Sequence, residues 1–355
     1  MKVIVVGAGI AGLAAAWELT KAGIEVMVLE SERRAGGVIV TEPVDGFVVE
    51  GGPDGFLAGE AELPELAREL GIGDRVVSQR ARGTSIWTGN DLETIDEGRA
   101  ATLLGIDARR EDVTAGFKSF AAGMIEPVTV LARQLGGAIR FAQGVAGLTR
   151  AGAGWHLAIT GGSTHDAGAV VLALPAYRAG RLLEAAGVTH ARALEDVLYA
   201  ATITVSLAYR AEQITSRLDG TGFVVDPGVA GDHAALLQLR ACTYTSQKFP
   251  GRAPAGHVLV RAFLSFGDGD PGAAAHTQLA AILGIRGEPL WSRTFYWSRG
   301  LPRYRAAHRR HVDEVRHRLE RLPPLAIAGA GYDGAGVSAC VRSGRAAAAE
   351  IMKRL

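Results

Sequence analysis

The sequence predicts an α/β fold in which a parallel-sheet domain is interleaved with a smaller α+β domain, and three observations support this prediction. A strand-like run, a glycine-rich turn and an Ala/Leu-rich helix follow one another between residues 3 and 22. Apolar segments that read as further buried strands recur far along the chain, at 169–174 and 325–328. A second set of strand-like segments occurs at 202–209, 222–225, 235–243 and 257–263.

The glycine-rich turn near the start of the chain has the spacing G-x-G-x-x-G. The β-branched run before it, VIVV, is typical of a buried parallel strand. Gly7 permits a tight turn, Gly9 lets the backbone approach a pyrophosphate, and Gly12 lets the helix pack closely on the sheet. The free N–H groups and positive dipole end of that helix favour phosphate binding. The pattern therefore predicts a Rossmann-like dinucleotide site.

A second glycine motif follows the next predicted strand, Glu25 to Leu29. Glu30, at the end of that strand, stands where a carboxylate accepts a bond from a ribose hydroxyl. Arg34, Gly36 and Gly37 complete an E-x-x-x-R-x-G-G pattern, which resembles the second glycine motif of FAD proteins related to glutathione reductase. We expect the arginine to pair with phosphate or with a bridging acid, the alternative being a solvated surface arginine. The two motifs together favour FAD over NAD.

Further segments extend this resemblance along the whole chain. They are GAGIAGLAAA, LESERRAGGVIVT, GFVVEGGPDGFL, TSQKFPGRAP, LPRYRAAH and AGAGYDGAGVSACVRSGRAAA. In this order they resemble the protoporphyrinogen/coproporphyrinogen oxidase family, which is FAD-dependent and belongs to the flavin amine oxidase superfamily. The resemblance implies a Rossmann-like FAD-binding domain of the glutathione-reductase type, and an oxidase that dehydrogenates a porphyrinogen with O2 as acceptor.

The resemblance also implies roles for individual residues around the FAD. Near the flavin ring it places Val38 and the loop of Gly52, Pro53, Asp54 and Gly55. The remaining assignments are the pyrophosphate to Gly7, Ala8, Gly9, Ile10, Ala11 and Gly12; the adenosine ribose to Glu30 and Ser31; the adenine to Val145; and the isoalloxazine ring to Trp297, Ala335, Gly336 and Val337.

Physical arguments also bear on two of these ring assignments, Val337 and Trp297. The segment from Val337 onward reads as a helix, whose N-terminus would stabilise negative charge on the reduced ring. Trp297 has a competing interpretation, because a tryptophan between apolar residues is usually part of a core.

No catalytic residue is predicted beyond the flavin itself, because the resemblance implies no dedicated base. Two weak candidates are Lys248, which could hold a water near the flavin N5, and His308 near the flavin edge. A loop lysine and a structural histidine are the more ordinary interpretations.

The predicted domain boundaries follow from the motifs that must meet around one cofactor. The FAD-binding domain is expected to comprise 1–75, 117–175 and 320–355, and the substrate domain 76–116 and 176–319. The family typically carries a helical insertion in the middle, which we expect to be absent between 95 and 116. An acid, Glu60, also stands where relatives tend to carry a basic residue facing a propionate, so it would repel that group.

Composition excludes several other classes of protein. The chain has 355 residues, 48% of them hydrophobic, and a net charge of +1, so we expect no nucleic-acid partner. Cys242 and Cys340 lack metal-binding spacing, so no metal site is expected. No run of about eighteen apolar residues predicts a membrane span. We expect a cytoplasmic enzyme, with a homodimer as a further hypothesis.

Three functions are compatible with these observations. The first is a shortened porphyrinogen oxidase, favoured by motif order. The second is an FAD-dependent oxidase of a smaller amine or cyclic metabolite, favoured by the missing insertion and by Glu60. The third is a non-catalytic FAD-bound partner protein.

Overall fold

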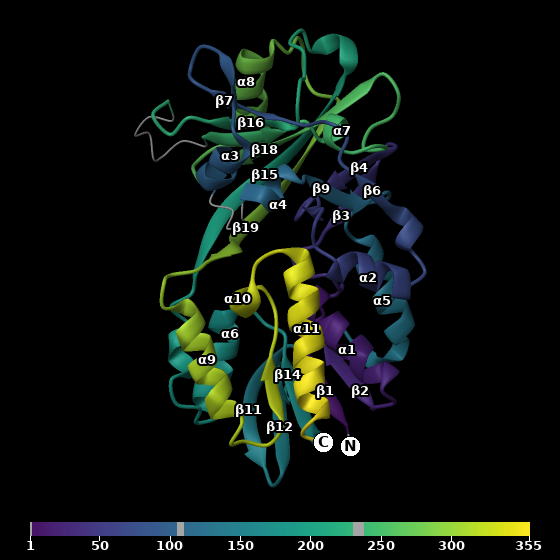
Figure 1. The fold of residues 1–355 in the computed structure, drawn as a ribbon, viewed down its shortest axis with the longest axis vertical. Coiled ribbons are helices and arrows are strands. Elements are labelled where there is room, and N and C mark those ends of the chain that lie inside the picture. The colour runs from purple at the N-terminus through teal and green to yellow at the C-terminus, as the bar shows by residue number, and fades with distance from the viewer. Residues whose placement is uncertain (1, 105–109, 230–237) are drawn as a thin grey trace.

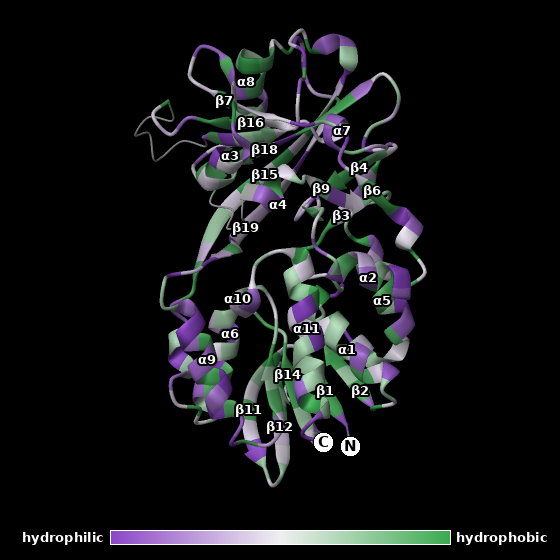
Figure 2. Cartoon of the chain, viewed as in Figure 1, coloured by the Kyte–Doolittle hydropathy of each residue, from purple (hydrophilic) through white to green (hydrophobic). Residues whose placement is uncertain are grey.

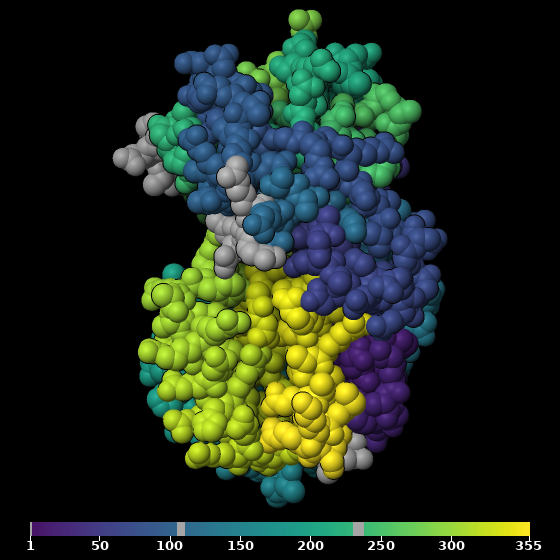
Figure 3. Space-filling view, in the orientation of Figure 1, coloured from purple at the N-terminus to yellow at the C-terminus, as the bar shows by residue number. Residues whose placement is uncertain are grey.

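The computed structural model describes residues 2–104, 110–229 and 238–355. Figure 1 shows two lobes joined by long strands, with both chain ends in the lower lobe. The surface narrows where the lobes meet, as Figure 3 shows. Among the described residues, no helix is both long enough and apolar enough to cross a membrane.

A five-stranded parallel sheet forms the centre of the lower lobe, in the order β10-β2-β1-β14-β20. All four residues of β1 are buried, because both faces of the sheet are covered. Val3 and Val5 face one core, whereas Ile4 and Val6 face the other. The strands are β1 (Val3–Val6), β2 (Val26–Leu29), β10 (Ile139–Arg140), β14 (Ala169–Leu172) and β20 (Leu325–Ile327).

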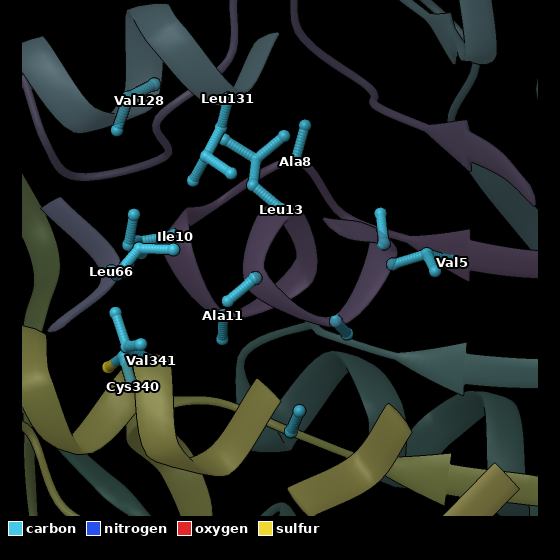
Figure 4. Packing of buried hydrophobic residues seen from close by; sticks show 14 of the residues in the cluster. Val5, Ala8, Ile10, Ala11, Leu13, Leu66, Val128, Leu131, Cys340 and Val341 are labelled. Carbon is cyan, nitrogen blue, oxygen red and sulfur yellow. The ribbon is translucent and has the colours of Figure 1, made fainter. Parts of the chain in front are cut away.

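Four helices cover one face of this sheet. Figure 4 shows their apolar side chains meeting around the start of α1, with Leu131 and Val341 on opposite sides of it. The backbones of α1 and α11 touch at Gly344, where an added Cβ would collide with the carbonyl oxygen of Ala11. The helices are α1 (Ile10–Lys21), α2 (Glu62–Glu69), α5 (Glu126–Leu135) and α11 (Val337–Met352).

The other face is covered by an antiparallel sheet and by helices. Trp155 is fully buried there. Helix α9, whose sequence HRRHVDEVRHRL is rich in arginine, turns Val312, Val315 and Leu319 toward the sheet and a hydrophilic face outward (Figure 2). These elements are β11 (Val145–Ala151), β12 (Gly154–Ile159), β13 (Thr164–Ala167), α6 (Ala176–Ala185), α9 (His308–Leu319) and α10 (Ala330–Asp333).

The upper lobe contains a seven-stranded sheet in the order β19-β15-β18-β17-β16-β7-β8. Its pairs are antiparallel except β16 with β7, which are parallel, so the sheet is mixed. The strand predicted at 235–243 begins at Leu239 among the described residues, and 235–237 lie outside them. The strands are β7 (Thr84–Trp87), β8 (Leu92–Ile95), β15 (Leu198–Arg210), β16 (Gly222–Val225), β17 (Leu239–Thr243), β18 (His257–Leu264) and β19 (Trp291–Arg303).

The two faces of the upper sheet are distinct. One face packs against helix α8 (Pro271–Leu283), and part of the other packs against α3 (Glu97–Leu104). Short elements fill the space where the lobes meet. They are the hairpin β3 (Thr41–Val44) and β4 (Phe47–Glu50), the small sheet of β5 (Phe56–Leu57), β6 (Val76–Ser78) and β9 (Phe117–Phe120), and the helices α4 (Arg110–Thr114) and α7 (Thr245–Lys248).

The packing favours domain boundaries that differ from the predicted ones. Helices α6 and α9 contribute Leu183 and Val315 to the core of the five-stranded sheet, although 176–319 were expected in the substrate domain. Strand β6 pairs with β9, so 76–78 belong with 117–120. We propose an FAD-binding domain of residues up to 78, 117–197 and 304–355, interleaved with a substrate domain of 79–116 and 198–303.

Candidate functional site

The three glycines of the first motif have different surroundings. Gly7 has φ +104°, and an added Cβ there would collide with the carbonyl oxygen of Ala173. An added Cβ on Gly12 would collide with the carbonyl oxygen of Gly7. At Gly9 an added Cβ would meet no atom of the described residues within 4 Å. Gly7 and Gly12 are therefore needed by the fold itself, whereas the space above Gly9 is open to a ligand.

Helix α1 begins directly after this open space. Its N-cap is Gly9, no side chain caps it, and its first turn contains no acid. The side chains of Ala8, Ile10 and Ala11 lie in the buried apolar cluster, as Figure 4 shows. The uncapped amides and the helix dipole therefore suit a phosphate group.

Glu30 lies at the end of β2, beside the glycine turn. The residue is 7% exposed, and its carboxylate accepts bonds from the Ala8 amide at 2.7 Å, the Glu32 amide at 2.9 Å and the Ser31 hydroxyl at 3.2 Å. A carboxylate offers about four acceptor positions, so capacity remains for a ribose hydroxyl. The structure thus fixes Glu30 and Ser31 as a pair at the edge of the first motif.

The second glycine motif lies against the first. Gly36 donates to the carbonyl of Ala8 at 2.8 Å and forms a parallel bridge with Gly9, and Gly37 is next to it. Arg34 contacts no acid among the described residues. Its guanidinium donates to backbone carbonyls of its own loop, at residues 35, 37 and 39, at 2.6 to 3.2 Å. These bonds hold the guanidinium against its own loop, and its pairing with phosphate or with a bridging acid stays a prediction.

Val145 reaches the same region from another part of the chain. It is the first residue of β11 rather than the last of a strand. The preceding residues bring it there, because Gln143 donates to the carbonyl of Glu30 at 2.7 Å and Gly144 lies beside Ser31. The predicted ribose and adenine positions are therefore neighbours.

The loop after β4 connects the lobes. The carbonyl oxygen of Gly51 accepts bonds from Trp297 Nε1 at 2.8 Å, Arg261 Nη2 at 3.0 Å and Thr204 Oγ1 at 3.1 Å. Gly52 lies against Val38, since an added Cβ would collide with the Val38 carbonyl oxygen. Trp297, Val38 and Gly52, which were predicted near the flavin, are thus brought together.

Asp54 and Lys248 form an ion pair in this loop. The Lys248 ammonium donates to both carboxylate oxygens of Asp54, at 2.9 and 3.1 Å, and lies over the rings of Phe117 and Phe249. Burial opposes ionisation of Asp54, but Lys248 and then Arg261 outweigh it and lower the pKa of the carboxyl. Lys248 therefore has a structural partner, which disfavours it as the holder of a catalytic water.

Lys248 belongs to a larger cluster of buried charges. Glu50 accepts from the Thr41 hydroxyl at 2.6 Å and from the Met124 amide at 2.8 Å, and its carboxylate lies 3.6 Å from Arg252. Burial raises the pKa of Glu50 and lowers the pKa of Arg252.

His308 was predicted near the flavin edge, and its contacts in the structure are with other parts of the protein. It is the first residue of α9, its ring stacks on Tyr304 with centroids 4.6 Å apart, and its Nε2 lies 3.4 Å from the Tyr332 carbonyl. Burial lowers the pKa of its imidazole. These contacts favour the structural interpretation.

The C-terminal motif forms a turn between β20 and α11. Asp333, at the end of α10, accepts bonds from Arg316 at 2.7 Å and from Ser343. Gly336 is the N-cap of α11 and has no side-chain cap, and Ala335 and Val337 flank it. The Glu60 carboxylate lies on this helix end, 3.6 Å from the position of a Cβ added to Gly336. Burial raises the pKa of Glu60.

Sequence reasoning did not single out Thr204, Arg261, Arg252 or Glu50. One signal was present, since Arg261 interrupts the apolar run HVLVRAFL. A charged residue within a buried strand requires a partner, and that partner marks a structural or functional site. The described residues contain no group of three or more His, Cys, Asp or Glu suited to a metal ion.

Comparison with known proteins agrees with this arrangement. The model of the flavin containing amine oxidoreductase family matches residues 10–122 and 84–352. The chain belongs to this family. It is an oxidoreductase whose cofactor is FAD. The two matched segments overlap in the region where the family's helical insertion was expected to be missing.

Individual relatives align over nearly their whole length. Coproporphyrinogen III oxidase from Bacillus subtilis (strain 168) is 22% identical over 471 positions, which span 99% of this chain and 98% of that protein. The enzyme of the same name from Propionibacterium freudenreichii subsp. freudenreichii is 26% identical, over 98% and 90% of the two chains. The alignment has 471 positions whereas this chain has 355 residues, so gaps in this chain account for the difference. This agrees with a chain that is shorter than the relative.

Solved structures share the fold. A candidate protoporphyrinogen oxidase from Exiguobacterium sp. 255-15 superimposes with a TM-score of 0.84 at 23% identity, over 100% of this chain and 99% of that one. Cyclohexylamine oxidase from Brevibacterium oxydans IH-35A gives 0.77 at 14% identity, over 99% and 98% of the two chains. The fold is therefore that of FAD-dependent amine oxidases, with its glutathione-reductase-type nucleotide domain.

Proposed function

We propose that this flavoenzyme dehydrogenates a porphyrinogen and passes the electrons to O2. The alignment with two coproporphyrinogen III oxidases over at least nine-tenths of their length supports this substrate class. The observation that carries the proposal is that the separated glycine segments meet around open space above Gly9.

Chain segments far apart in sequence would hold the FAD. We assign the pyrophosphate to Gly9 and the first amides of α1, the ribose to Glu30 and Ser31, and the adenine to Val145. The ring is assigned to the Gly52 loop, to Trp297 and to the turn at Ala335, Gly336 and Val337. When bound, the flavin accepts a hydride from an activated carbon and returns electrons to the acceptor. The protein's part is to bind, to orient and to exclude water.

The test is the visible spectrum of the purified protein during anaerobic addition of coproporphyrinogen or protoporphyrinogen. We expect the flavin absorbance to bleach while porphyrin fluorescence rises, and air to restore the oxidised spectrum with release of peroxide. A flavin that stays oxidised with both porphyrinogens would contradict the proposed substrate, and a flavin reduced by them that air does not reoxidise would contradict O2 as acceptor.

An oxidase of smaller amines is the second candidate, and one cavity favours it. Of the described residues that line this cavity of about 390 Å³, Glu60, Glu62 and Asp112 are acidic, and the basic one, Arg342, is already paired with Glu62. An acidic lining attracts an ammonium group and repels a propionate. Putrescine and cyclohexylamine, added under the same anaerobic conditions, would then bleach the flavin, and Glu60→Gln would weaken that response.

Two further assignments, of cellular location and of oligomeric state, accompany the proposal. A cytoplasmic location and a homodimer remain hypotheses, to be tested by cell fractionation and by light scattering. If neither porphyrinogens nor amines reduce a bound FAD, the interpretation as a non-catalytic FAD-bound partner protein gains support.

A further inference from the structure

The carbonyl of Gly51 is held by three side chains from three adjacent strands. Thr204 of β15, Arg261 of β18 and Trp297 of β19 all donate to this oxygen, at 2.8 to 3.1 Å. A carbonyl oxygen has two lone pairs, so three donors exceed its ordinary complement. Thr204 and Arg261 are 2% and 4% exposed, which removes water as a competitor. The peptide that follows Gly51 is therefore fixed and strongly polarised.

The other end of that peptide has no partner. In a planar trans peptide the N–H of Gly52 points away from the Gly51 carbonyl. Among the described residues, no acceptor bonds this N–H. The amide cannot shift toward Val38, whose carbonyl oxygen already lies close against Gly52. Because backbone N–H groups in folded proteins are nearly always paired, this one is suited to a ligand.

The charge cluster behind the loop has an excess of one positive charge. It contains the cations Lys248, Arg252 and Arg261, each less than a tenth exposed, and the acids Glu50 and Asp54. Within the part of the chain that the structure describes, the Nε atom of Arg261 and two nitrogens of Arg252 are buried without a hydrogen-bond partner. An unpaired buried cation is unfavourable, so this cluster favours the appearance of negative charge nearby.

We propose that Thr204 and Arg261 are positioning residues that make the Gly52 N–H a polarised donor to the flavin ring, and that the buried positive charge raises the flavin's reduction potential. Bonds to the Gly51 carbonyl strengthen the donor at the other end of the peptide. A hydride consists of two electrons and one proton. A flavin that takes up one hydride therefore gains one negative charge, which the fixed donor and the cations stabilise. This inference rests on the FAD placement proposed above.

The first test is Thr204→Val in the FAD-loaded protein, which removes one donor at nearly constant volume. Losing one bond changes an equilibrium by up to about tenfold, and for a two-electron couple tenfold corresponds to about 30 mV. We expect FAD to be retained and its potential, measured against reference dyes, to fall by up to that amount. Thr294→Val is the matched control, since Thr294 lies on β19 but faces the opposite side of the sheet. The reduction potential of the flavin in Thr294→Val should not change.

The second test separates charge from geometry. Sulfite forms an anionic adduct with oxidised flavins, so we expect Arg261→Met to weaken sulfite binding at least tenfold and Arg261→Lys to restore part of it. If Thr204→Val and Arg261→Met both hold FAD with wild-type potential and sulfite affinity, the inference is overturned while FAD binding stands. If Arg261→Met does not fold, the reduction potential of the flavin in Thr204→Val decides alone whether the inference holds. A wild-type protein that binds no FAD would instead refute the proposed function.

Discussion

At the scale of single residues, glycines of the same motif have different physical surroundings. An added side chain at Gly12 would collide with the protein's own backbone, whereas at Gly9 it would enter open space. Gly12 is therefore required for folding, whereas we propose that Gly9 is required for binding. The same distinction separates Arg34, which supports its own loop, from Glu30, which keeps acceptor capacity for a ligand.

We predict that Gly9→Val folds but loses its FAD. The isopropyl group would occupy the space assigned to the pyrophosphate while leaving the protein core unchanged. The check is the ratio of flavin to protein absorbance after gel filtration, together with the far-ultraviolet circular dichroism. Gly12→Val is the matched comparison and should fail to fold. A yellow Gly9→Val protein would contradict the assigned pyrophosphate position.

At the scale of elements, the turn between β20 and α11 is held by one carboxylate. Asp333 accepts bonds from Arg316 of α9 and from Ser343 of α11, and Ser343 also accepts the Gly329 amide at 2.9 Å. Burial opposes ionisation of Asp333, but Arg316 and Ser343 outweigh it and hold its pKa below the usual 3.8. Three elements thus share one ionised group, which positions the N-terminus of α11.

We predict that Asp333→Asn destabilises the protein by about 1–2 kcal/mol at neutral pH, because it replaces a charge-assisted bond with a neutral one. Since the folded-state pKa of Asp333 is lowered, its contribution is present above about pH 4 and is lost as the pH falls through the folded-state value. The difference in urea midpoint between wild type and variant should therefore shrink at low pH. An equal difference at pH 7 and pH 3 would refute the electrostatic explanation.

At the scale of the whole molecule, the proposed FAD site draws on both lobes. The pyrophosphate and ribose positions belong to the lower lobe, whereas Trp297 and the donors to Gly51 come from the upper sheet. A cofactor that contacts both lobes stabilises their arrangement as well as each lobe.

We predict that removing FAD lowers the melting temperature, and that adding it back restores the loss. A ligand present at a hundred times its Kd stabilises the folded state by about 2.7 kcal/mol. ADP is the matched control, because it can occupy the positions at Gly9 and Glu30 without reaching the upper lobe. It should restore only part of the stability, and full restoration by ADP would contradict a flavin held between the lobes.

The sequence by itself determined the nucleotide motifs, because they depend on local requirements. Gly7, Gly9 and Gly12 are set by turn geometry and close approach within one strand, turn and helix, and Glu30 by the end of the next strand. These requirements act over a few residues, so their spacing can be read directly. The same holds for β15, β16, β17 and β18 of the upper sheet, which show as short apolar runs, whereas β7, β8 and β19 were not predicted.

Tertiary structure alone decided which distant side chains became partners. Lys248 and Asp54 are 194 positions apart, and Arg261 and Gly51 are 210 apart, yet each pair is in hydrogen-bond contact. Buried charges select partners by position in space, and neither spacing nor periodicity encodes that position. The packing of α6 and α9 on the lower sheet was likewise fixed by the shared core, which the order of motifs could not reveal.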